Sequence, residues 1–380
     1  MSLISKRSDI ETLPLQTLLR PVSDATAALA RLDERLAGST VREGWIERTH
    51  YLDACASLWV DGELVHIEDL VLHDAGADIR TPTHELTIAR DVLRTRRRIA
   101  AQPTGWALGA EGLRSLRGEG RAEESAPAAD ERLSLPSRPL PAGGQVEESE
   151  DEVPDPLAAE LAAIDAVLAR SEAALADVKR PARGAVRAKN TLVYDADWDE
   201  DERLDAWRAV LTETAELPPV LRAVLLLDAW DRRPVLQHAA WLGRLLAASC
   251  LRDAGLTTAS HLATVNLGLK AVRIERRTHR DREARLLARL EGIVLATEAG
   301  FKEHDRLLLA RQMMERRLAG RRQTSKLPEL VEFVLSRPLV SAGMVAKALE
   351  ITPRAALALV QELNLRELTG RGRFRAWGIV

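Results

Sequence analysis

Aromatic and β-branched residues are scarce in this chain of 380 residues. Phe, Trp and Tyr together make up 3% of the sequence, and these residues, with Val, Ile and Thr, are the ones that favour extended strands. An extensive β-sheet is therefore excluded. Ala, Leu and Arg dominate instead, so the composition predicts a mainly α-helical protein. The length allows two or three domains, each able to bury its own core.

Cysteines and long apolar runs are also few. The two cysteines, Cys55 and Cys250, each lie in an apolar helical pattern. A free cysteine there behaves as a small buried hydrophobe, so neither a disulfide nor a catalytic thiol is expected. No run approaches the roughly 18 apolar residues that a membrane span needs, and the first residues lack the apolar core of a signal peptide. We expect a cytoplasmic protein without membrane contact.

The chain lacks an excess of positive charge as well. Its formal net charge is -3, which excludes a globally basic nucleic-acid coat protein. Any contact with nucleic acid must therefore come from a local patch. His66, His73 and His84 lack the close spacing of zinc ligands. The sequence predicts no metal site and no cofactor.

Helical periodicity marks the first region, residues 1–116. Apolar residues recur at intervals of three and four over 24–37, 45–60 and 82–99, which predicts three helices. The segment Thr-Pro-Thr-His-Glu at 81–85 supplies start signals for the third, because proline is tolerated in a first helical turn.

A change of composition separates this region from the next. Residues 117–156 are rich in Gly, Pro, Ser, Ala and Glu and include the acidic run 147–152. Such a segment buries too little apolar area to offset its ordering entropy. We interpret it as a flexible acidic linker, with a specific acidic docking tail as the alternative.

A second helical region, the predicted body, covers residues 157–325. One narrow apolar stripe follows 157–178, which is typical of a core helix or a helix pair and too short for a dimeric coiled coil. After an irregular stretch, helical patterns continue over 198–320. The basic segment 270–282 interleaves acids with its arginines, as in a solvated or salt-bridged helix face.

Residues 238–244 carry a partial motif inside the predicted body. The chain here resembles the Fic family, whose members usually transfer AMP from ATP to protein hydroxyls and share the motif His-Pro-Phe-x-Asp/Glu-Gly-Asn-Gly-Arg-x-Gly-Arg. In that family the His is the base, the acid holds magnesium, and the glycine-rich turn forms a backbone nest for phosphates. His238 matches the His, and Gly243 with Arg244 match the last Gly-Arg. Residues 239–242 replace the acid, the nest and the first Arg.

The altered loop offers neither a carboxylate for a metal ion nor an anion nest for a triphosphate. The resemblance therefore implies a Fic-like helical body that is catalytically degenerate, and we expect no adenylylation. A histidine without its partners is more often structural than catalytic, which is the alternative role for His238.

A second match to the same family lies at residues 57–62, which resemble the Ser-x-x-x-Glu-Gly signature of the Fic inhibitory helix. The resemblance implies that Asp61, at the Glu position, pairs with Arg244, so the two should lie within salt-bridge distance. Alternatively, Asp61 and Gly62 only form the cap and turn at a helix end. The whole chain is also similar to a group of uncharacterised helix-turn-helix proteins of rhizobial plasmids and mobile elements, which implies a replicon-associated role.

The last region, residues 326–380, has the spacing of a helix-turn-helix. Short helices are predicted over 327–335, 341–349 and 353–363, the second capped by its first residue, a serine. Thr352 is the expected N-cap of the third, with a proline in its first turn. The third helix is expected to bury Ala356, Leu359, Val360 and Leu363.

Residues 368–377 predict a tight β-wing. Alternation of period two places its arginines on one face and Phe374 with Ala376 on the other. Residues 337–380 contain seven Lys or Arg against three Asp or Glu, so positive charge is concentrated where a wing would meet a phosphate backbone. The predicted DNA-contacting residues are Thr352, Arg354, Gln361, Arg371, Arg373 and Arg375.

These features together favour a DNA-binding regulator or replicon-associated factor that does not act by catalysis. Its winged helix would bind double-stranded DNA, and its Fic-like body would serve as scaffold, dimer platform or sensor. The third helix is poor in base-reading side chains, so a protein-binding adaptor is an alternative. An enzyme that retains nucleotide transfer at His238 and Arg244 is another. The sequence leaves open whether the protein is a homodimer.

Overall fold

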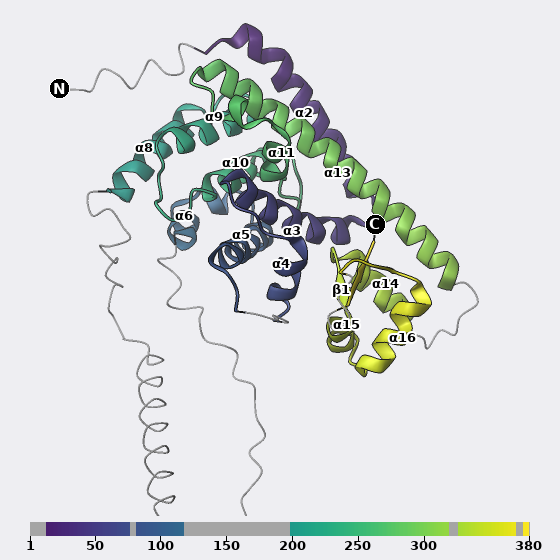
Figure 1. The fold of residues 1–380 in the computed structure, drawn as a ribbon. Coiled ribbons are helices and arrows are strands. Elements are labelled where there is room, and N and C mark those ends of the chain that lie inside the picture. Colours follow the sequence, from purple (N-terminus) through teal and green to yellow (C-terminus); the bar gives the residue numbers. More distant parts are fainter. Residues whose placement is uncertain (1–12, 77–80, 118–197, 319–325, 370–374, 380) are drawn as a thin grey trace, which may run out of the picture. The chain divides into compact units, whose positions relative to one another are not determined.

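The computed structural model describes residues 13–76, 81–117, 198–318, 326–369 and 375–379 (Figure 1). The predicted linker beyond Arg117 and the apolar stripe at 157–178 lie outside these residues. Helices account for nearly all regular structure in the described residues, and a small three-stranded sheet lies close to the C-terminus. The predicted mainly α fold with a C-terminal β-wing is confirmed.

The elements follow one another in three groups. The first group contains α2 (Leu15–Ala37), α3 (Arg42–Val60), α4 (Ile67–Asp74), α5 (His84–Ala101), the short helix η1 (Trp106–Leu108) and α6 (Ala110–Leu116). The second contains α8 (Glu200–Glu213), α9 (Pro219–Arg232), α10 (Leu242–Asp253), α11 (Val265–Ala271), α12 (Ile274–Arg277) and α13 (Arg282–Leu318). The third contains α14 (Leu327–Leu335), β1 (Val340–Ser341), α15 (Ala342–Leu349), α16 (Pro353–Leu363), β2 (Arg366–Glu367) and β3 (Ala376–Gly378).

The three helices predicted in the first region are present, but each begins at another residue than predicted, α3 at Arg42 instead of residue 45. α2 begins at Leu15 rather than at residue 24, because Pro21 lies inside the helix instead of ending it. α5 begins at His84, and Thr83 is its N-cap, with its side chain accepting a hydrogen bond from the backbone N–H of Leu86 at 3.3 Å. Pro82 therefore precedes the cap and does not occupy the first turn.

Helices of the first and second groups share one hydrophobic core. α2 lies along the 37-residue helix α13, as Figure 1 shows, and α3 packs against α5 and α11. The described residues before 118 and after 198 accordingly belong to one compact unit. The predicted N-terminal region and the predicted body are thus a single packing unit.

Two helices of this core approach each other closely at two glycines. α11 and α13 meet at Gly268 and Gly292, where a Cβ atom on Gly268 would lie 1.9 Å from the carbonyl oxygen of Gly292. No side chain larger than hydrogen fits there without moving the backbones apart. Gly268 therefore fixes the position of α11 and of its residues Asn266 and Leu267.

A buried charge network joins α3, α5 and α11. Asp53 and Arg96 are both 0% exposed, and the Asp53 carboxylate lies 2.5 Å from Arg96 Nη1. The same carboxylate accepts hydrogen bonds from the Asn266 side chain at 2.7 Å and from the Leu267 backbone at 2.9 Å. Arg96 also donates to the backbone carbonyl of Leu262 at 3.0 Å. A buried charge pair is tolerated when its remaining hydrogen-bonding groups find partners in this way.

A buried histidine ties the loop before α11 to α2. His261 Nδ1 lies 2.6 Å from an oxygen of Asp33, which also accepts a hydrogen bond from the Thr258 backbone at 3.0 Å. Burial lowers the pKa of His261, although Asp33 partly opposes this shift. Burial alone would raise the pKa of Asp33, but the hydrogen bonds from His261 and Thr258 outweigh it and leave the pKa lowered. Burial also lowers the pKa of His50 well below its usual value, with Arg96 adding to the shift.

We expect the protein to lose stability when the pH falls below 6.5, the ordinary pKa of histidine. His50 and His261 have lowered pKa values in the folded state, so the unfolded chain takes up protons first as the pH falls. Each neutral buried histidine should cost up to about 1.4 kcal/mol of unfolding free energy per pH unit in this range. Urea unfolding between neutral and mildly acidic pH measures the slope. His261→Gln should flatten it, whereas His66→Gln, at an exposed position, should not. An equal slope in His261→Gln and the parent protein would contradict the assignment.

The third group of elements is docked on the rest of the unit. Apolar residues of α14, α15, α16 and β3 form one cluster with residues of α2, α3 and α13. Arg48, 2% exposed, pairs with Glu303 at 2.7 Å and donates to the backbone carbonyl of Arg337. Arg317 near the end of α13 donates to the carbonyl of Leu363 at the end of α16. The C-terminal module is therefore held by a shared core and by hydrogen bonds from Arg48 and Arg317.

Candidate nucleic-acid interface

α15, α16 and the turn between them form the helix-turn-helix. α15 follows Ser341, whose Oγ accepts a hydrogen bond from the backbone N–H of Met344 at 3.2 Å. Glu350 ends it in the left-handed conformation, with a φ of 55°. Thr352 begins α16, because its Oγ1 accepts a hydrogen bond from the backbone N–H of Ala355 at 3.3 Å. Both predicted N-caps are confirmed.

One face of α16 is packed against the module's core. Ala356, Val360 and Leu363 are buried, as predicted. Leu359 is only partly buried, which corrects the prediction that all four apolar residues are enclosed. The physical reason is that a helix lying at a surface buries a stripe narrower than its apolar sequence pattern.

The opposite face of α16 is open to solvent. Thr352, Arg354 and Gln361, the predicted DNA-contacting residues of this element, are all exposed. No described residue forms a salt bridge with Arg354. The exposed face also carries Ala355 and Ala358, whose small side chains would let the helix approach a partner closely. The start of this face therefore presents an arginine that is available to bind an anion or a base edge.

The wing is a three-stranded antiparallel sheet in the order β1-β3-β2. Trp377 of β3 pairs with Val340 on one side and Glu367 on the other. Arg375 is exposed and Ala376 is buried, so the predicted alternation holds at these two positions. Phe374 and the predicted contacts Arg371 and Arg373 lie outside the described residues. The strand β1 is not part of the sequence prediction, because its two residues are too few to give a pattern.

Two of the basic residues counted in the C-terminal region already contact other side chains of this protein. Arg375 pairs with Glu367 at 2.7 Å, and its guanidinium lies 5.3 Å from the centre of the Trp377 ring. Arg337 donates a hydrogen bond to the hydroxyl of Tyr51 in α3 at 2.8 Å. Arg337 therefore helps to dock the module and does not add to a DNA-facing charge. Lys347 and Arg366, which are exposed, are basic positions that the sequence prediction did not name.

The second predicted site brings together residues of α3 and α10. The two oxygens of Asp61 accept hydrogen bonds from Arg244 at 2.9 and 2.6 Å, so the predicted contact between these residues is confirmed. Arg244 also donates to Asn266 at 2.5 Å and to the hydroxyl of Ser57 at 3.0 Å. Asp61 is at the same time the C-cap of α3, followed by Gly62 with a φ of 92°. Asp61 therefore both pairs with Arg244 and caps α3.

The other two residues of the predicted pocket lie elsewhere. The side chain of His238 is 45% exposed, and its Nδ1 lies 3.9 Å from an oxygen of Glu200. Gly243 packs beneath Trp230, where an added Cβ would lie 2.3 Å from the indole ring. Among the described residues, the cleft next to Arg244 is lined by neither of them. Gly243 is therefore needed where α10 packs against Trp230 of α9.

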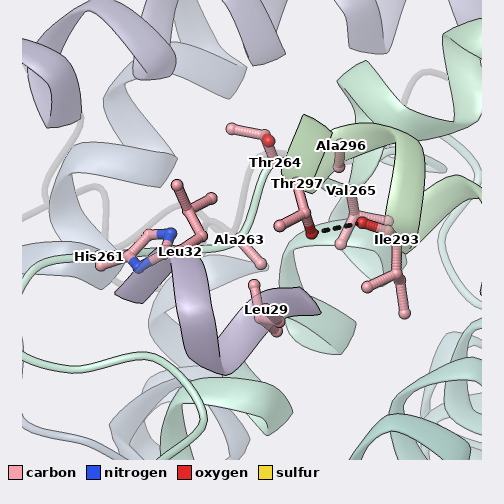
Figure 2. A pocket seen from close by; sticks show the side chains of 9 residues that line it. All are labelled: Leu29, Leu32, His261, Ala263, Thr264, Val265, Ile293, Ala296 and Thr297. Atoms are coloured by element: carbon pink, nitrogen blue, oxygen red, sulfur yellow. Dashed lines mark hydrogen bonds between the residues drawn. The ribbon is translucent and has the colours of Figure 1, made fainter. Parts of the chain in front are cut away.

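A small cavity lies between α2, α11 and α13 and is lined by the side chains in Figure 2. Its volume is about 10 Å³, which is room for about one water molecule. Leu29, Leu32 and Ile293 form its apolar wall, and the Thr297 hydroxyl is bound to the carbonyl of Ile293 at 2.7 Å. The cavity is too small for an organic ligand.

The two cysteines and the potential metal ligands show no sign of a reactive site in the described parts of the chain. Burial raises the pKa of Cys55 to about 12 and that of Cys250 to about 11, so both thiols are protonated at neutral pH. Within the described ranges, no group of three His, Cys, Asp or Glu is arranged to hold a metal ion. A separate search of the same ranges finds no helix that is both long and apolar enough to span a membrane.

Comparison with known families finds two matching segments in the chain. Residues 327–380 match a family model described as an HTH DNA binding domain, and residues 192–319 match a model described as a protein of unknown function, DUF1612. The protein therefore combines a DUF1612 region with a C-terminal helix-turn-helix DNA-binding domain.

One curated relative matches almost the whole chain. It is the "Uncharacterized protein y4cF" of Sinorhizobium fredii (strain NBRC 101917 / NGR234), which is 57% identical over 378 residues, or 98% of this chain and 99% of the relative. The chain belongs to the same family as this rhizobial protein. The predicted similarity to rhizobial helix-turn-helix proteins is confirmed.

Proposed function

We propose that this protein is a sequence-specific DNA-binding regulator or a replicon-associated factor. The observation that carries the proposal is the capped, exposed start of α16, with Thr352 and Arg354, in a domain that matches a DNA-binding family. In a helix-turn-helix, the N-terminal residues of the second helix enter the major groove and contact base edges.

The exposed face of α16 suits base contacts of two kinds. Arg354 can donate two hydrogen bonds to the O6 and N7 atoms of a guanine, and Gln361 can contact an adenine. Ala355 and Ala358 can pack on thymine methyl groups. The arginines of the wing, Arg371, Arg373 and Arg375, would neutralise phosphates in the flanking backbone.

The helical body is proposed to act without catalysis, as a Fic-derived scaffold, sensor or dimer platform. The pairing of Asp61 with Arg244 supports this ancestry. The position of His238 beside Glu200, away from the cleft at Arg244, argues against nucleotide transfer. We propose that the protein works in the cytoplasm, where its DNA target would be a plasmid or other mobile replicon, and that it binds the target as a homodimer.

A protein-binding adaptor is a second candidate, favoured by the composition of α16. The exposed face of this helix carries two alanines and Glu362 beside its two polar base-reading candidates. Few charged donors face outward, and Arg375 of the wing is already paired with Glu367. Genome-wide recovery of DNA bound to the tagged protein separates the candidates, since an adaptor would enrich no sites.

Replacing Arg354 with Ala should cost about 1 to 3 kcal/mol of discrimination at one base pair of the selected site, because a bidentate contact is lost. Selection of bound sequences from a random duplex pool, followed by gel-shift titration, measures this change.

Replacing the three wing arginines, Arg371, Arg373 and Arg375, should instead weaken binding to all sequences. It should also reduce the slope of log affinity against log salt by up to about 3.

The matched control is Arg20→Ala on α2, since the Arg20 side chain is 91% exposed and its salt bridge among the described residues is an exposed one with Asp24. This variant should bind like the parent protein. Unchanged preference in Arg354→Ala, together with an unchanged salt slope in the wing variant, would overturn the proposed DNA contacts.

A further inference from the structure

An arginine-lined cleft opens beside the Asp61–Arg244 pair, on the side of the body formed by the ends of several helices. It lies between the C-terminal ends of α3 and α9, the helices α11 and α12, and the first turns of α13. Its arginines are Arg232, Arg244, Arg277, Arg280, Arg285 and Arg289. Asp61 and Asp231 are its acidic residues. With six arginines against two aspartates, the lining has a strong excess of positive charge.

Part of this charge is neutralised within the protein. Arg244 is held by Asp61. Arg289 lies 2.9 Å from the buried Asp228 and 2.8 Å from Asp231, and Arg285 lies 3.0 Å from Asp228. Each of the three nearby aspartates, Asp61, Asp228 and Asp231, therefore already forms a salt bridge with an arginine.

Arg277 and Arg280 are the two lining arginines without a close ion pair among the described residues, although Asp61 and Asp231 lie near enough to act on the charge of Arg277. Neither forms a salt bridge with any residue that the structure describes. The Nε atom of Arg277 is buried and has no hydrogen-bond partner among those residues. Its guanidinium lies 5.5 Å from the centre of the Trp59 ring, which restricts its orientation. Burial lowers the pKa of Arg277 and repulsion from Arg244 adds to the shift, while Asp61 and Asp231 partly oppose it; an anion placed here would also offset the repulsion.

The segment that supplies these two arginines is not the single helix face expected for 270–282. α11 ends at Ala271, α12 covers only Ile274–Arg277, and an irregular turn leads to α13 at Arg282. Arg276 points away from the cleft and pairs with Glu291, whereas Arg277 and Arg280 line it. The prediction of a solvated or salt-bridged helix face therefore holds for Arg276. Arg277, the next residue of α12, is instead half-buried in the cleft, because consecutive residues of a helix point about 100° apart.

We propose that this cleft binds a small, multiply charged oxyanion, of which a diphosphate group is the best match. The cleft has a volume of about 440 Å³, within the usual range of small-molecule sites. Planar guanidinium groups bind phosphate oxygens through paired hydrogen bonds. A recessed site suits a small anion better than the convex backbone of a duplex.

The proposal is independent of the DNA-binding function, and it assigns no role to His238 or Gly243. The binding cations, Arg277 and Arg280, lie outside the segments that resemble the Fic motifs. Binding leaves the Asp61–Arg244 pair intact and involves no chemical step.

Calorimetric titration of the full chain with inorganic pyrophosphate, at constant ionic strength, tests the site. One saturable site per chain is expected, with an affinity at least about tenfold higher than for sulfate, because pyrophosphate can contact more than one arginine. The double variant Arg277→Ala, Arg280→Ala should weaken binding by at least about tenfold. The control Arg276→Ala removes one positive charge at the position next to Arg277 and should change affinity by less than about twofold.

Three results would overturn the proposal. One is the absence of saturable binding at millimolar pyrophosphate by a protein whose thermal midpoint shows that it is folded. Another is an equal loss of affinity in Arg276→Ala and in the double variant, since this would indicate surface charge alone. The third is displacement of pyrophosphate by a short DNA duplex, with DNA binding lost in the double variant, which would assign the cleft to nucleic acid. The calorimetric titration with pyrophosphate alone contains no DNA, so its outcome is separate from that of the gel shifts.

Discussion

Replacing Arg96 with Ala is expected to lower the free energy of unfolding by about 3 to 5 kcal/mol, because it leaves the charge of Asp53 buried without its partner. Both side chains are 0% exposed, so water cannot replace the lost interaction. Asp53→Ala should cost a similar amount, since Arg96 would then be the unpaired charge. Urea unfolding followed by circular dichroism measures both values.

The double variant of this pair gives a sharper test than either single variant. Residues in contact are coupled, so removing both should cost less than the sum of the two single losses. Recovery should be incomplete, because Asn266 and the Leu267 backbone also lose the Asp53 carboxylate. Arg20→Ala is the exposed control and should change stability by less than about 1 kcal/mol. A loss in Arg96→Ala as small as in this control would show that the network does not hold α3, α5 and α11 together.

The second large loss is expected for Arg244→Ala, at about 2 to 4 kcal/mol. Its side chain is 6% exposed and binds Asp61, Asn266 and Ser57. The effect should be smaller than at Arg96, because the side chain of Asp61 is 32% exposed and can regain water. Chemical denaturation of the full chain measures the loss.

The coupling energy between Asp61 and Arg244 shows whether their contact itself stabilises the protein or whether each side chain contributes only by packing. Asp61→Ala in the Arg244→Ala background should cost less than in the parent protein, by at least about 0.5 kcal/mol. Arg244→Lys keeps the charge but loses the two-pronged contact with the carboxylate, so it should recover only part of the loss. Fully additive losses would contradict a direct energetic link between α3 and α10.

Local sequence signals were reliable in the C-terminal module. Ser341 and Thr352 cap their helices, and the apolar spacing of α16 identifies three of its buried residues. These features depend on neighbours in the chain, so a single sequence contains them. Apolar periodicity was less reliable for the start of α2, which begins at Leu15 and not at residue 24 and contains Pro21, where packing along α13 outweighs the helix-breaking tendency of a proline.

Local patterns could not predict the arginine cleft. Its lining comes from positions as distant as Asp61, Asp231 and Arg289. Whether an arginine is paired or available depends on which carboxylates the fold brings near it, as the neighbours Arg276 and Arg277 show. The contact of Asp61 with Arg244 was predictable only through resemblance to a family, since neither residue carries a local sign of the other.

The sequence by itself determined the mainly helical class, the helix-turn-helix at the C-terminus and the caps that delimit its helices, since periodicity and capping act over a few residues. Tertiary structure alone decided that the first region and the body share one core, that Arg337 docks the module instead of facing DNA, and that Arg277 lies in a cleft. The physical reason is that burial and ion pairing depend on neighbours in space, which helices far apart in the chain supply only after they have packed.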